Sequence, residues 1–410
     1  MTADNPIPAV PNLRFPEFRN TSGWSIEPLG HLFTERQETG FSDLPLLSVT
    51  DREGVIPQEE TNRKNNSNSN KEKYLRVVPG DIAYNTMRMW EGRSALVGME
   101  GVVSPAYTVC QPRVNTNSDF FGYYFKTNTL IKQFRKYSQG LVKDTLNLKY
   151  EAFSGIPVGF PSPREQQKIA DCLGSLDQLI AAECRKLEGL RQHKQGLMQQ
   201  LFPLPGETVP RLRFPEFADA PEWREETLGN MVAIMSGKSP SQYTLLSKGD
   251  CAFVKVEDLN NCIKYQVHGR EYCNDGRDAV PIGSILFPKR GASIENNKIR
   301  ITASAVLIDT NLMALKPHNR AATEFLYYYI VRVGLAQIAD TSSIPQINNK
   351  HIIPYRVLIP CDELEQKRIG DFLSIADASL SAQAQKVTAL KAHKQGLLQQ
   401  LFPSLEGNEQ

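Results

Sequence analysis

Several short polar segments carry arginine, lysine, asparagine and glutamine side chains that could bind nucleic acid. Arginine and lysine neutralise phosphates, and asparagine can pair with an adenine edge through two hydrogen bonds in the major groove. Residues 85–93 (NTMRMWEGR) follow an expected strand and combine amide, guanidinium and aromatic groups. Residues 287–291 (FPKRG) occupy the corresponding place after a strand later in the chain. These segments predict two separate DNA-contacting surfaces.

The candidate DNA-contacting residues are Arg63, Lys64, Asn85, Thr86, Arg88, Trp90, Arg93, Lys143, Ser236, Lys238, Lys289, Arg290, Asn297, Lys298, Gln346 and Asn348. A solvated basic loop is the commoner outcome for any one such segment. The amide-rich residues 63–71 equally fit a disordered loop. The alternative interpretation therefore stays open for every segment.

Signatures of catalysis and of metal binding are missing from the sequence. Residues 236–239 (SGKS) resemble the end of a phosphate-binding loop, but Val232 stands where that motif requires glycine. The chain lacks the Asp/Asn-Pro-Pro-Tyr/Phe run of an adenine methyltransferase and any evident nuclease core of carboxylates and lysine. The set Cys251, Cys262, His268 and Cys273 lacks the short Cys-x-x-Cys spacing of zinc sites. We expect no catalytic residue and no metal site.

Composition places the chain among folded proteins without a membrane segment. Its 410 residues carry 47 basic and 45 acidic side chains, a net charge of +2, so any DNA binding must use local patches or charge from partners. Seven cysteines, an odd number, indicate reduced thiols rather than a disulfide framework. The first residues do not read as a secretion signal, and no apolar run approaches the about 18 residues of a membrane helix. We expect a cytoplasmic location.

One module of about 200 residues is written twice. Residues 13–18 (LRFPEF) recur as residues 212–217 at an offset of 199, and residues 193–197 (HKQGL) recur as residues 393–397 at an offset of 200. Between these shared blocks, residues 33–160 and 232–360 align poorly. A drifting duplication should blur the whole module, so the pattern favours two readers of different targets on a common frame.

Each repeat ends in a long helix with a heptad seam. The positions from Ile169 to Leu201, spaced four and three residues apart, are apolar at eight of ten places, and so are those from Ile369 to Leu401. Ser162 and Asp362 suit helix N-caps, with Glu165 and Glu365 completing a capping box. We expect the two helices to pair antiparallel within the chain as a rigid rod with rough twofold symmetry. The alternative is that each packs on its own domain.

Glycine recurs inside both helices, at Gly196 and Gly396, beside Leu197 and Leu397. Glycine inside a helix costs about 1 kcal/mol relative to alanine, so its repetition suggests close approach of another backbone. A tolerated surface glycine is the alternative.

The expected fold class is mixed α/β: two globular domains joined by two long antiparallel coiled-coil helices. Strands are expected at residues 74–78, 95–98, 252–256 and 284–287, and helices at 120–137 and 325–339. The expected segments are a repeat block (1–22), a first insert domain (23–160), a first long helix (161–203), a linker with the second repeat block (204–221), a second insert domain (222–360), a second long helix (361–403) and a tail (404–410).

This arrangement of inserts, repeated blocks and Glu-Gln-x-x-Ile helices resembles the specificity (S) subunit of type I restriction-modification enzymes over essentially the whole chain. The resemblance implies that each insert is a target-recognition domain for one half of a bipartite, asymmetric DNA sequence, and that the helices set the spacer. It implies docking of two methyltransferase (M) subunits and of restriction-translocation (R) subunits, for which Gly196, Gly396, Leu197 and Leu397 are the candidate contacts. S-adenosylmethionine, ATP and Mg²⁺ would bind to those partners, and no cofactor to this chain.

Two other classes of function compete with this interpretation. The first is an enzyme, such as a divergent nuclease or methyltransferase. The second is a coiled-coil scaffold whose two inserts bind proteins. Adjacent genes for a methyltransferase and an ATP-dependent translocase would separate these classes.

Overall fold

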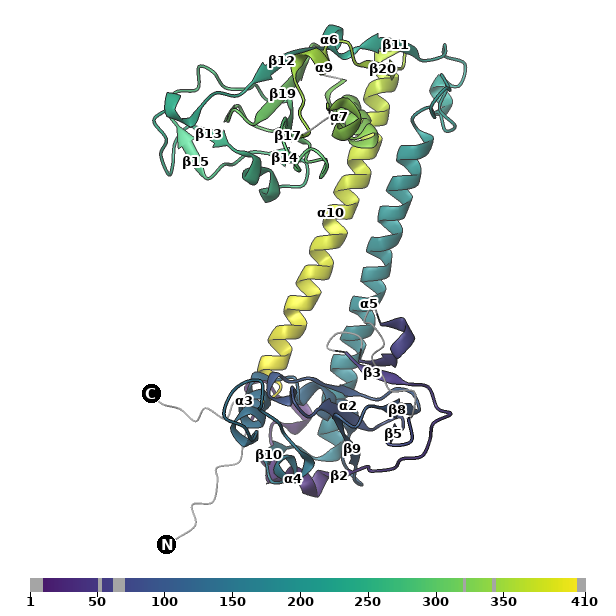
Figure 1. Cartoon of the computed structure of the whole chain (residues 1–410), viewed down its shortest axis with the longest axis vertical. Coiled ribbons are helices and arrows are strands. Elements are labelled where there is room, and N and C mark those ends of the chain that lie inside the picture. Colours follow the sequence, from purple (N-terminus) through teal and green to yellow (C-terminus); the bar gives the residue numbers. More distant parts are fainter. Residues whose placement is uncertain (1–9, 51–53, 62–70, 320–321, 341–343, 404–410) are drawn as a thin grey trace. The chain divides into compact units, whose positions relative to one another are not determined.

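The computed structural model describes residues 10–50, 54–61, 71–319, 322–340 and 344–403. The chain divides into two compact units (Figure 1). Unit 1 comprises Met1–Cys184 and Lys386–Gln410, and unit 2 comprises Arg185–Gln385. The long helices α5 (Pro163–Gln200) and α10 (Glu363–Gln400) each contribute a segment to both units.

The insert domain of unit 1 is built on an antiparallel sheet of order β2-β9-β6-β7. Smaller pairs are β1-β10, β3-β4 and β5-β8. The strands are β1 (Ser25–Pro28), β2 (Phe33–Glu35), β3 (Leu47–Val49), β4 (Val55–Pro57), β5 (Leu75–Val77), β6 (Ile82–Asn85), β7 (Ser94–Leu96), β8 (Gly101–Val103), β9 (Tyr107–Pro112) and β10 (Pro157–Phe160). The helices are α1 (Leu29–Leu32), α2 (Ser118–Tyr124), α3 (Asn128–Tyr137) and α4 (Tyr150–Ser154), with 3-10 turns η1 (Pro16–Phe18), η2 (Gln58–Glu60) and η3 (Met89–Glu91).

Unit 2 repeats this arrangement with unrelated side chains. Its main sheet has the order β12-β19-β16-β17-β14, and a second sheet has the order β15-β13-β18. The strands are β11 (Arg224–Thr227), β12 (Val232–Ser236), β13 (Cys251–Val254), β14 (Tyr265–Gln266), β15 (Glu271–Cys273), β16 (Ile285–Pro288), β17 (Arg300–Thr302), β18 (Val306–Ile308), β19 (Leu312–Pro317) and β20 (Arg356–Ile359). The helices are α6 (Leu228–Met231), α7 (Ala322–Val333), α8 (Leu335–Ile338) and α9 (Asn349–Ile352), with η4 (Pro215–Phe217), η5 (Pro240–Gln242) and η6 (Val256–Asn261).

Strands expected from sequence coincide with β5, β7, β13 and β16, so these predictions are confirmed. The two expected helices are each broken once. Residues 120–137 divide into α2 and α3, because the backbone of Thr127 is extended and its side chain caps the start of α3. Residues 325–339 divide into α7 and α8 at Gly334, whose φ of +86° is a left-handed conformation that favours glycine.

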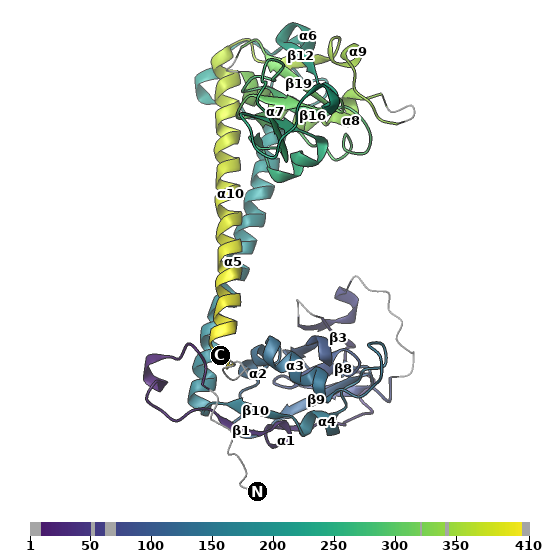
Figure 2. The same cartoon turned by 90° about the vertical axis from the view of Figure 1, so that its left-hand side faces the viewer.

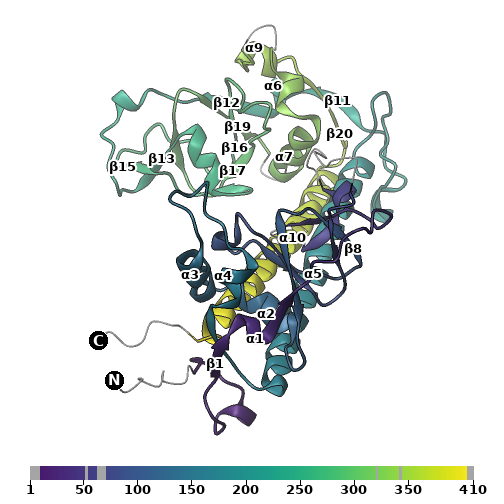
Figure 3. The same cartoon turned by 60° about the horizontal axis from the view of Figure 1, so that its bottom comes forward.

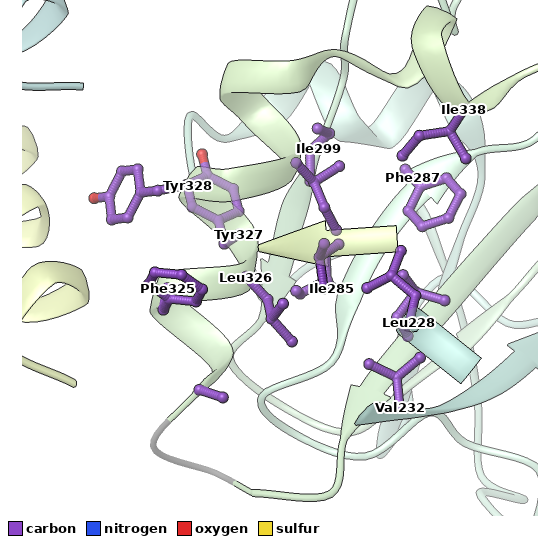
Figure 4. Close-up of a cluster of buried hydrophobic side chains, with 14 of the residues drawn as sticks. Leu228, Val232, Ile285, Phe287, Ile299, Phe325, Leu326, Tyr327, Tyr328 and Ile338 are labelled. Carbon is purple, nitrogen blue, oxygen red and sulfur yellow. The ribbon is translucent and has the colours of Figure 1, made fainter. Parts of the chain in front are cut away.

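The core of each unit packs its sheet against several helices. In unit 2, Ile285 of β16 lies between α7 and the α6–β12 segment, and Phe287 lies beside Ile338 of α8 (Figure 4). In unit 1, Phe120 and Tyr124 of α2 pack around Trp24, with ring centroids 5.7 and 5.9 Å from the indole. Burying large aromatic and aliphatic side chains contributes about 1.5–3 kcal/mol each to folding.

The heptad seam is confirmed, because every position of it on α5 and α10 is buried or partly buried. In unit 1, Lys394 Nζ lies 2.6 Å from Asp177 and Lys386 Nζ lies 2.6 Å from Glu183. The later position on α5 pairs with the earlier position on α10, so the two segments run antiparallel (Figures 1 and 2). The alternative, in which each helix packs only on its own domain, is wrong.

Ser162 caps α5 as predicted, accepting a hydrogen bond from the Glu165 N–H at 3.4 Å. The side chain of Glu165 bonds a different partner from the N-cap backbone that a capping box predicts. Glu165 is buried and accepts two hydrogen bonds from the guanidinium of Arg14 in the start block, which lies against the first turns of α5 (Figure 2). In unit 2, Glu365 accepts the same pair of bonds from Arg213, and a third at 3.3 Å from Trp223 Nε1.

The ends of the long helices enter the cores of the insert domains. Phe402, just beyond α10, stacks on Tyr124 of α2 with ring centroids 4.7 Å apart. The C-terminal end of α10 lies beside α2 in the ribbon view (Figure 3). Phe202, just beyond α5, packs on Trp223 in unit 2. Each end also accepts a backbone hydrogen bond of 2.9 Å from a start block: Gln400 from Leu13, and Gln200 from Leu212. The same frame is therefore assembled in each unit.

Candidate nucleic-acid interface

In unit 1, strand β6 delivers two candidate residues to one end of the main sheet. Asn85 ends the strand, and the backbone of Thr86 is held on both sides. Its N–H donates to Ala106 O at 3.1 Å, and its carbonyl accepts from the Leu148 N–H at 2.8 Å. The Thr86 hydroxyl also lies 3.1 Å from that of Thr108. The segment that follows therefore starts from a fixed base.

The turn after Thr86 is ordered by its own side chains. Asn85 Oδ1 accepts a hydrogen bond of 3.0 Å from the Met87 N–H, and Trp90 Nε1 donates one of 3.0 Å to the Met87 carbonyl. Met89 is fully buried and anchors the turn from below. The polar groups of Asn85 and Trp90 thus shape the loop, which leaves the guanidinium groups to face outward.

Arg88 and Arg93 are the exposed cations of this turn. Arg88 lies 3.5 Å and Arg93 lies 3.3 Å from the Glu91 carboxylate, and their side chains are 52% and 38% exposed. Exposed ion pairs of this length contribute about 0–1 kcal/mol, so a phosphate or a base edge can replace them at little cost. The Arg88 and Arg93 side chains are thus both accessible from solvent.

Lys143 lies at the tip of a neighbouring loop. Gln139 and Asn147 exchange two backbone hydrogen bonds of 2.8 Å at the base of this loop, and residues 140–145 between them are all exposed. The next residue, Leu148, bonds the carbonyl of Thr86. The structure thus brings Lys143 and the arginine turn to the same end of the sheet.

A basic helix face adjoins this turn and was not among the sequence candidates. Residues 120–143 contain five basic side chains and no acidic one. Helix α3 buries Leu130 and Phe134 and exposes Lys132, Arg135 and Lys136 on the opposite side. Just before this helix, the Lys126 amine donates to the Gly92 carbonyl of the arginine turn at 3.0 Å. The local run of like charge was the sequence signal for this surface.

Unit 2 places Lys289 and Arg290 where unit 1 places Thr86 and Met87. The Lys289 N–H donates to Asn311 O at 2.8 Å, and its carbonyl accepts from the Ile347 N–H at 2.9 Å, the same two bonds that fix Thr86. Arg290 is exposed and forms a β-bridge with Gln346. Burial lowers the pKa of the partly buried Lys289, and the adjacent Arg290 lowers it further. The correspondence between the two strand ends, predicted from sequence, is confirmed.

Ser236 and Lys238 reach the same end of the unit 2 sheet. Ser236 ends β12 and pairs with Met313 of β19, while Pro288 of β16 pairs with the preceding Leu312. Both Ser236 and Lys238 are exposed, and Lys238 Nζ lies 2.7 Å from Asp278. The basic and amide groups of unit 2 therefore gather at the end of its central strands.

Asn297 and Asn348 are used inside the domain. The Asn297 side chain donates to Val331 O at 2.9 Å and accepts from the Leu335 N–H at 3.0 Å, which joins α7 to α8. The Asn348 N–H donates to His351 Nδ1 at 3.1 Å at the start of α9. Lys298 follows Asn297 and is partly buried. The placement of Asn297 favours a structural role over a base contact.

The remaining candidates divide in three. Arg63 and Lys64 lie outside the described residues. Leu197 and Leu397 pack partly buried against the two cores. Gly196 and Gly396 have open space where a Cβ would stand, so the expected close approach of a backbone within the chain is wrong.

Within the ranges that the structure describes, no cluster of three or more His, Cys, Asp or Glu side chains could hold a metal ion. Cys251 and Cys273 lie opposite each other on β13 and β15, whereas Cys262 donates to Gln266 Oε1 at 3.0 Å. Across the same ranges, no helix combines the length and apolar character needed to cross a membrane.

Known proteins resemble this chain in sequence. The chain is 22% identical over 311 residues to the type I restriction enzyme MjaIX specificity subunit of Methanocaldococcus jannaschii, covering 72% of this chain and 71% of the relative. It is 27% identical over 176 residues to the HindI specificity subunit of Haemophilus influenzae, covering 42% and 38% of the two chains.

Solved structures share the fold. The type I restriction-modification system S subunit from M. genitalium has a TM-score of 0.59 at 15% identity, covering 97% of this chain and all of that one. A chain solved in work on complex assembly and conformational transition of the type I R-M system has a TM-score of 0.58 at 18% identity, covering 93% and 98%. The model of the type I restriction modification DNA specificity domain matches residues 47–192 and 221–392. The chain therefore belongs to the specificity-subunit family of type I restriction-modification systems.

Proposed function

We propose that this chain selects a bipartite, asymmetric DNA target, one half-site for each insert domain, without catalysing a reaction itself. One observation carries the proposal: the same backbone frame presents different side chains in the two units. Thr86 and Lys289 make equivalent backbone bonds, yet the turns that follow carry Arg88 and Arg93 in one unit and Arg290 in the other. Different side chains on one frame are what two different half-sites require.

The length and stiffness of the paired helices support a role as a ruler, which sets the distance between the two half-sites. Each helix has 38 residues, which corresponds to about 57 Å at 1.5 Å per residue. Two half-sites read from one face of DNA lie about one duplex turn, 34–36 Å, apart or a multiple of it. A helix pair keeps such a separation better than a flexible linker does.

The proposal assigns catalysis to partner subunits. Two methyltransferase subunits and the restriction-translocation subunits would dock on the helices, with Gly196, Leu197, Gly396 and Leu397 as candidate contacts. S-adenosylmethionine, ATP and Mg²⁺ would bind to those partners. Arg88, Arg93 and Lys143 with the α3 face would contact DNA in unit 1, and Lys238, Lys289, Arg290 and Gln346 would do so in unit 2.

Exchange of one insert tests the proposal. Methylated positions are mapped in DNA from cells that express the complete complex, first with this chain and then with residues 33–160 replaced by the insert of another family member. We expect one half-site to change while the other half-site and the spacer stay the same. A change in both half-sites, or methylation that is independent of sequence, would contradict it.

A further inference from the structure

The same three side chains, a tyrosine, an aspartate and a lysine, meet in both units. In unit 1, Tyr123 of α2 donates to Asp177 Oδ2 of α5 at 2.8 Å, and Lys394 of α10 contacts the same carboxylate at 2.6 and 2.7 Å. The Lys394 amine also lies 5.0 Å from the centroid of the Tyr123 ring. We call this set the first triad.

The second triad consists of Tyr328 of α7, Asp377 of α10 and Lys194 of α5. The Tyr328 hydroxyl donates to Asp377 Oδ2 at 2.5 Å, Lys194 pairs with the same carboxylate, and its amine lies 5.3 Å from the tyrosine ring. Helix α7 lies beside α10 in this unit (Figure 1). Asp177 recurs as Asp377 and Lys194 as Lys394, both at an offset of 200, so the aspartate and the lysine of each triad come from the repeated frame, while the tyrosine comes from the insert.

Each triad joins three parts of the chain: a helix of the insert domain, the long helix of the same repeat, and the long helix of the other repeat. It is complete only when the two long helices pair in one register and the insert domain has one orientation on them. Burial and the adjacent aspartate raise the pKa of both tyrosines, so each hydroxyl stays protonated and donates. The contact is therefore directional.

The other contacts between the insert helices and the long helices are apolar packing and a few hydrogen bonds. Asn117, the N-cap of α2, donates to Gln166 and Gln167 of α5 at 2.9 and 2.7 Å, and Ser374 of α10 donates to Glu324 of α7 at 3.2 Å. In unit 1, Phe120 and Phe121 share a core with Ile169 and Leu173 of α5. Apolar packing is non-directional, so it holds the domain on the helix without fixing its rotation as a charge-assisted hydrogen bond does. In unit 2, Lys264 adds two directional contacts to the second triad, since its buried amine donates to the Tyr328 hydroxyl at 2.7 Å and to Ser374 Oγ at 2.9 Å.

We propose that the two triads determine spacer specificity by fixing the angle at which each insert domain sits on the helix pair. This inference rests on the proposed function. Each base pair added to a spacer moves a half-site by about 3.4 Å and turns it by about 35° around the duplex. A domain held at one angle reads its half-site at one spacer length, whereas a domain free to rock tolerates neighbouring lengths.

The test uses the complete methyltransferase complex and duplexes that carry the mapped half-sites. The spacer has its natural length, or is one base pair shorter or longer, and the initial methylation rate is measured on each duplex. Tyr123→Phe removes only the hydroxyl of the first triad. Tyr124→Phe is the matched control, because the adjacent Tyr124 hydroxyl is buried without a hydrogen-bond partner among the described residues.

We expect Tyr123→Phe to lower the ratio of the rates on natural and altered spacers by about ten- to a hundredfold, the effect of losing one charge-assisted hydrogen bond. The bases read in each half-site should not change, and Tyr124→Phe should leave the ratio as it is. Asp177→Asn, which removes the charge and keeps the shape, should act like Tyr123→Phe.

A purely structural role predicts a different pattern. If Tyr123→Phe and Asp177→Asn slow methylation equally on all spacers, or leave every rate unchanged, the inference is wrong. If the unaltered complex already methylates without regard to sequence, the proposed function fails before any variant is compared. A complex that does not assemble with Asp177→Asn leaves the decision to the milder Tyr123→Phe variant.

Discussion

The guanidinium of Arg14 donates two hydrogen bonds, 2.8 and 2.7 Å long, to the carboxylate of Glu165, which is 1% exposed. The two residues are 151 positions apart, and their bond ties the start of the repeat to the first turn of its long helix. Arg213 and Glu365 form the same pair in the second repeat, with both bonds at 2.8 Å.

Breaking the Arg14–Glu165 pair should destabilise unit 1 strongly. Arg14→Ala leaves a buried carboxylate without its counter-charge, which costs about 3–5 kcal/mol of unfolding free energy. Urea denaturation followed by circular dichroism measures this change. Arg356→Ala is the control, because the partner Glu225 is 60% exposed and the expected change is about 0–1 kcal/mol. Equal effects of the two substitutions would contradict the prediction.

Two helix glycines should respond in opposite directions to alanine. A Cβ at Gly196 meets open space, so Gly196→Ala should raise the unfolding free energy by about 1 kcal/mol. A Cβ at Gly370 would lie 2.7 Å from the Glu324 Cβ and 3.0 Å from Phe325 N, so Gly370→Ala should push α7 off α10 and lower stability. Thermal denaturation of both variants measures the two changes in stability. A loss of stability in Gly196→Ala would contradict the prediction that a Cβ at this position meets open space.

The basic face of α3 should strengthen DNA binding without regard to sequence. Arg135→Gln with Lys136→Gln should weaken binding to target and non-target DNA alike, and should reduce the salt dependence of log Kd by about 1 per lost phosphate contact. Binding is measured over a series of salt concentrations. The control is Lys367→Gln with Arg368→Gln, an adjacent basic pair on α10 that already pairs with Asp371 and Glu216. A loss confined to target DNA would contradict the prediction.

Arg88 and Arg290 should act on different half-sites. Arg88→Ala should relax base preference only in the half-site read by unit 1, and Arg290→Ala only in that read by unit 2, each by about 1–3 kcal/mol. Methylation rates on duplexes with single substitutions in either half-site measure the preference. A shift in the same half-site for both variants would show that the units do not read separately.

Lengthening both long helices should lengthen the preferred spacer. Seven residues inserted at matching seam positions of α5 and α10 keep the heptad pattern and add about 10 Å, close to three base pairs. Mapping of methylated positions reads the new spacer. An insertion into α5 alone breaks the register and serves as the control, and an unchanged spacer after the double insertion would refute the ruler.

The long helices and the duplicated frame could be predicted from sequence because their signals are local or repeated. The seam from Ile169 to Leu201 is recognised from the spacing of its apolar residues alone, and residues 193–197 are identical to residues 393–397. The partner of Glu165 could not be deduced from helix-capping rules, since the capping box supplied a nearby alternative. The recurrence of Arg14 as Arg213 in the second repeat was the sequence signal for a partner outside the helix.

The sequence indicated a mixed α/β domain in each insert and the matching places of residues 85–93 and 287–291, but not the strand-by-strand equivalence of the two sheets. Short strands need only suitable apolar residues, so equivalent strands such as β6 and β16 share a place in the sheet without sharing side chains. The roles of the candidate DNA-contacting residues could not be predicted from residue type either. Asn297 looked like a base reader, but its backbone has a φ of +49° and its amide joins two helices, neither of which the residue type reveals.

The bonds from Leu13 to Gln400 and from Leu212 to Gln200 have the same length and the same place in their units. In one of them the peptide chain continues from helix to start block through residues 201–211, and in the other it does not. The contact forms with or without a covalent connection. The order of the two insert domains along the chain is therefore a matter of connectivity, and a circularly permuted chain that opens between residues 204 and 210 should adopt the same fold.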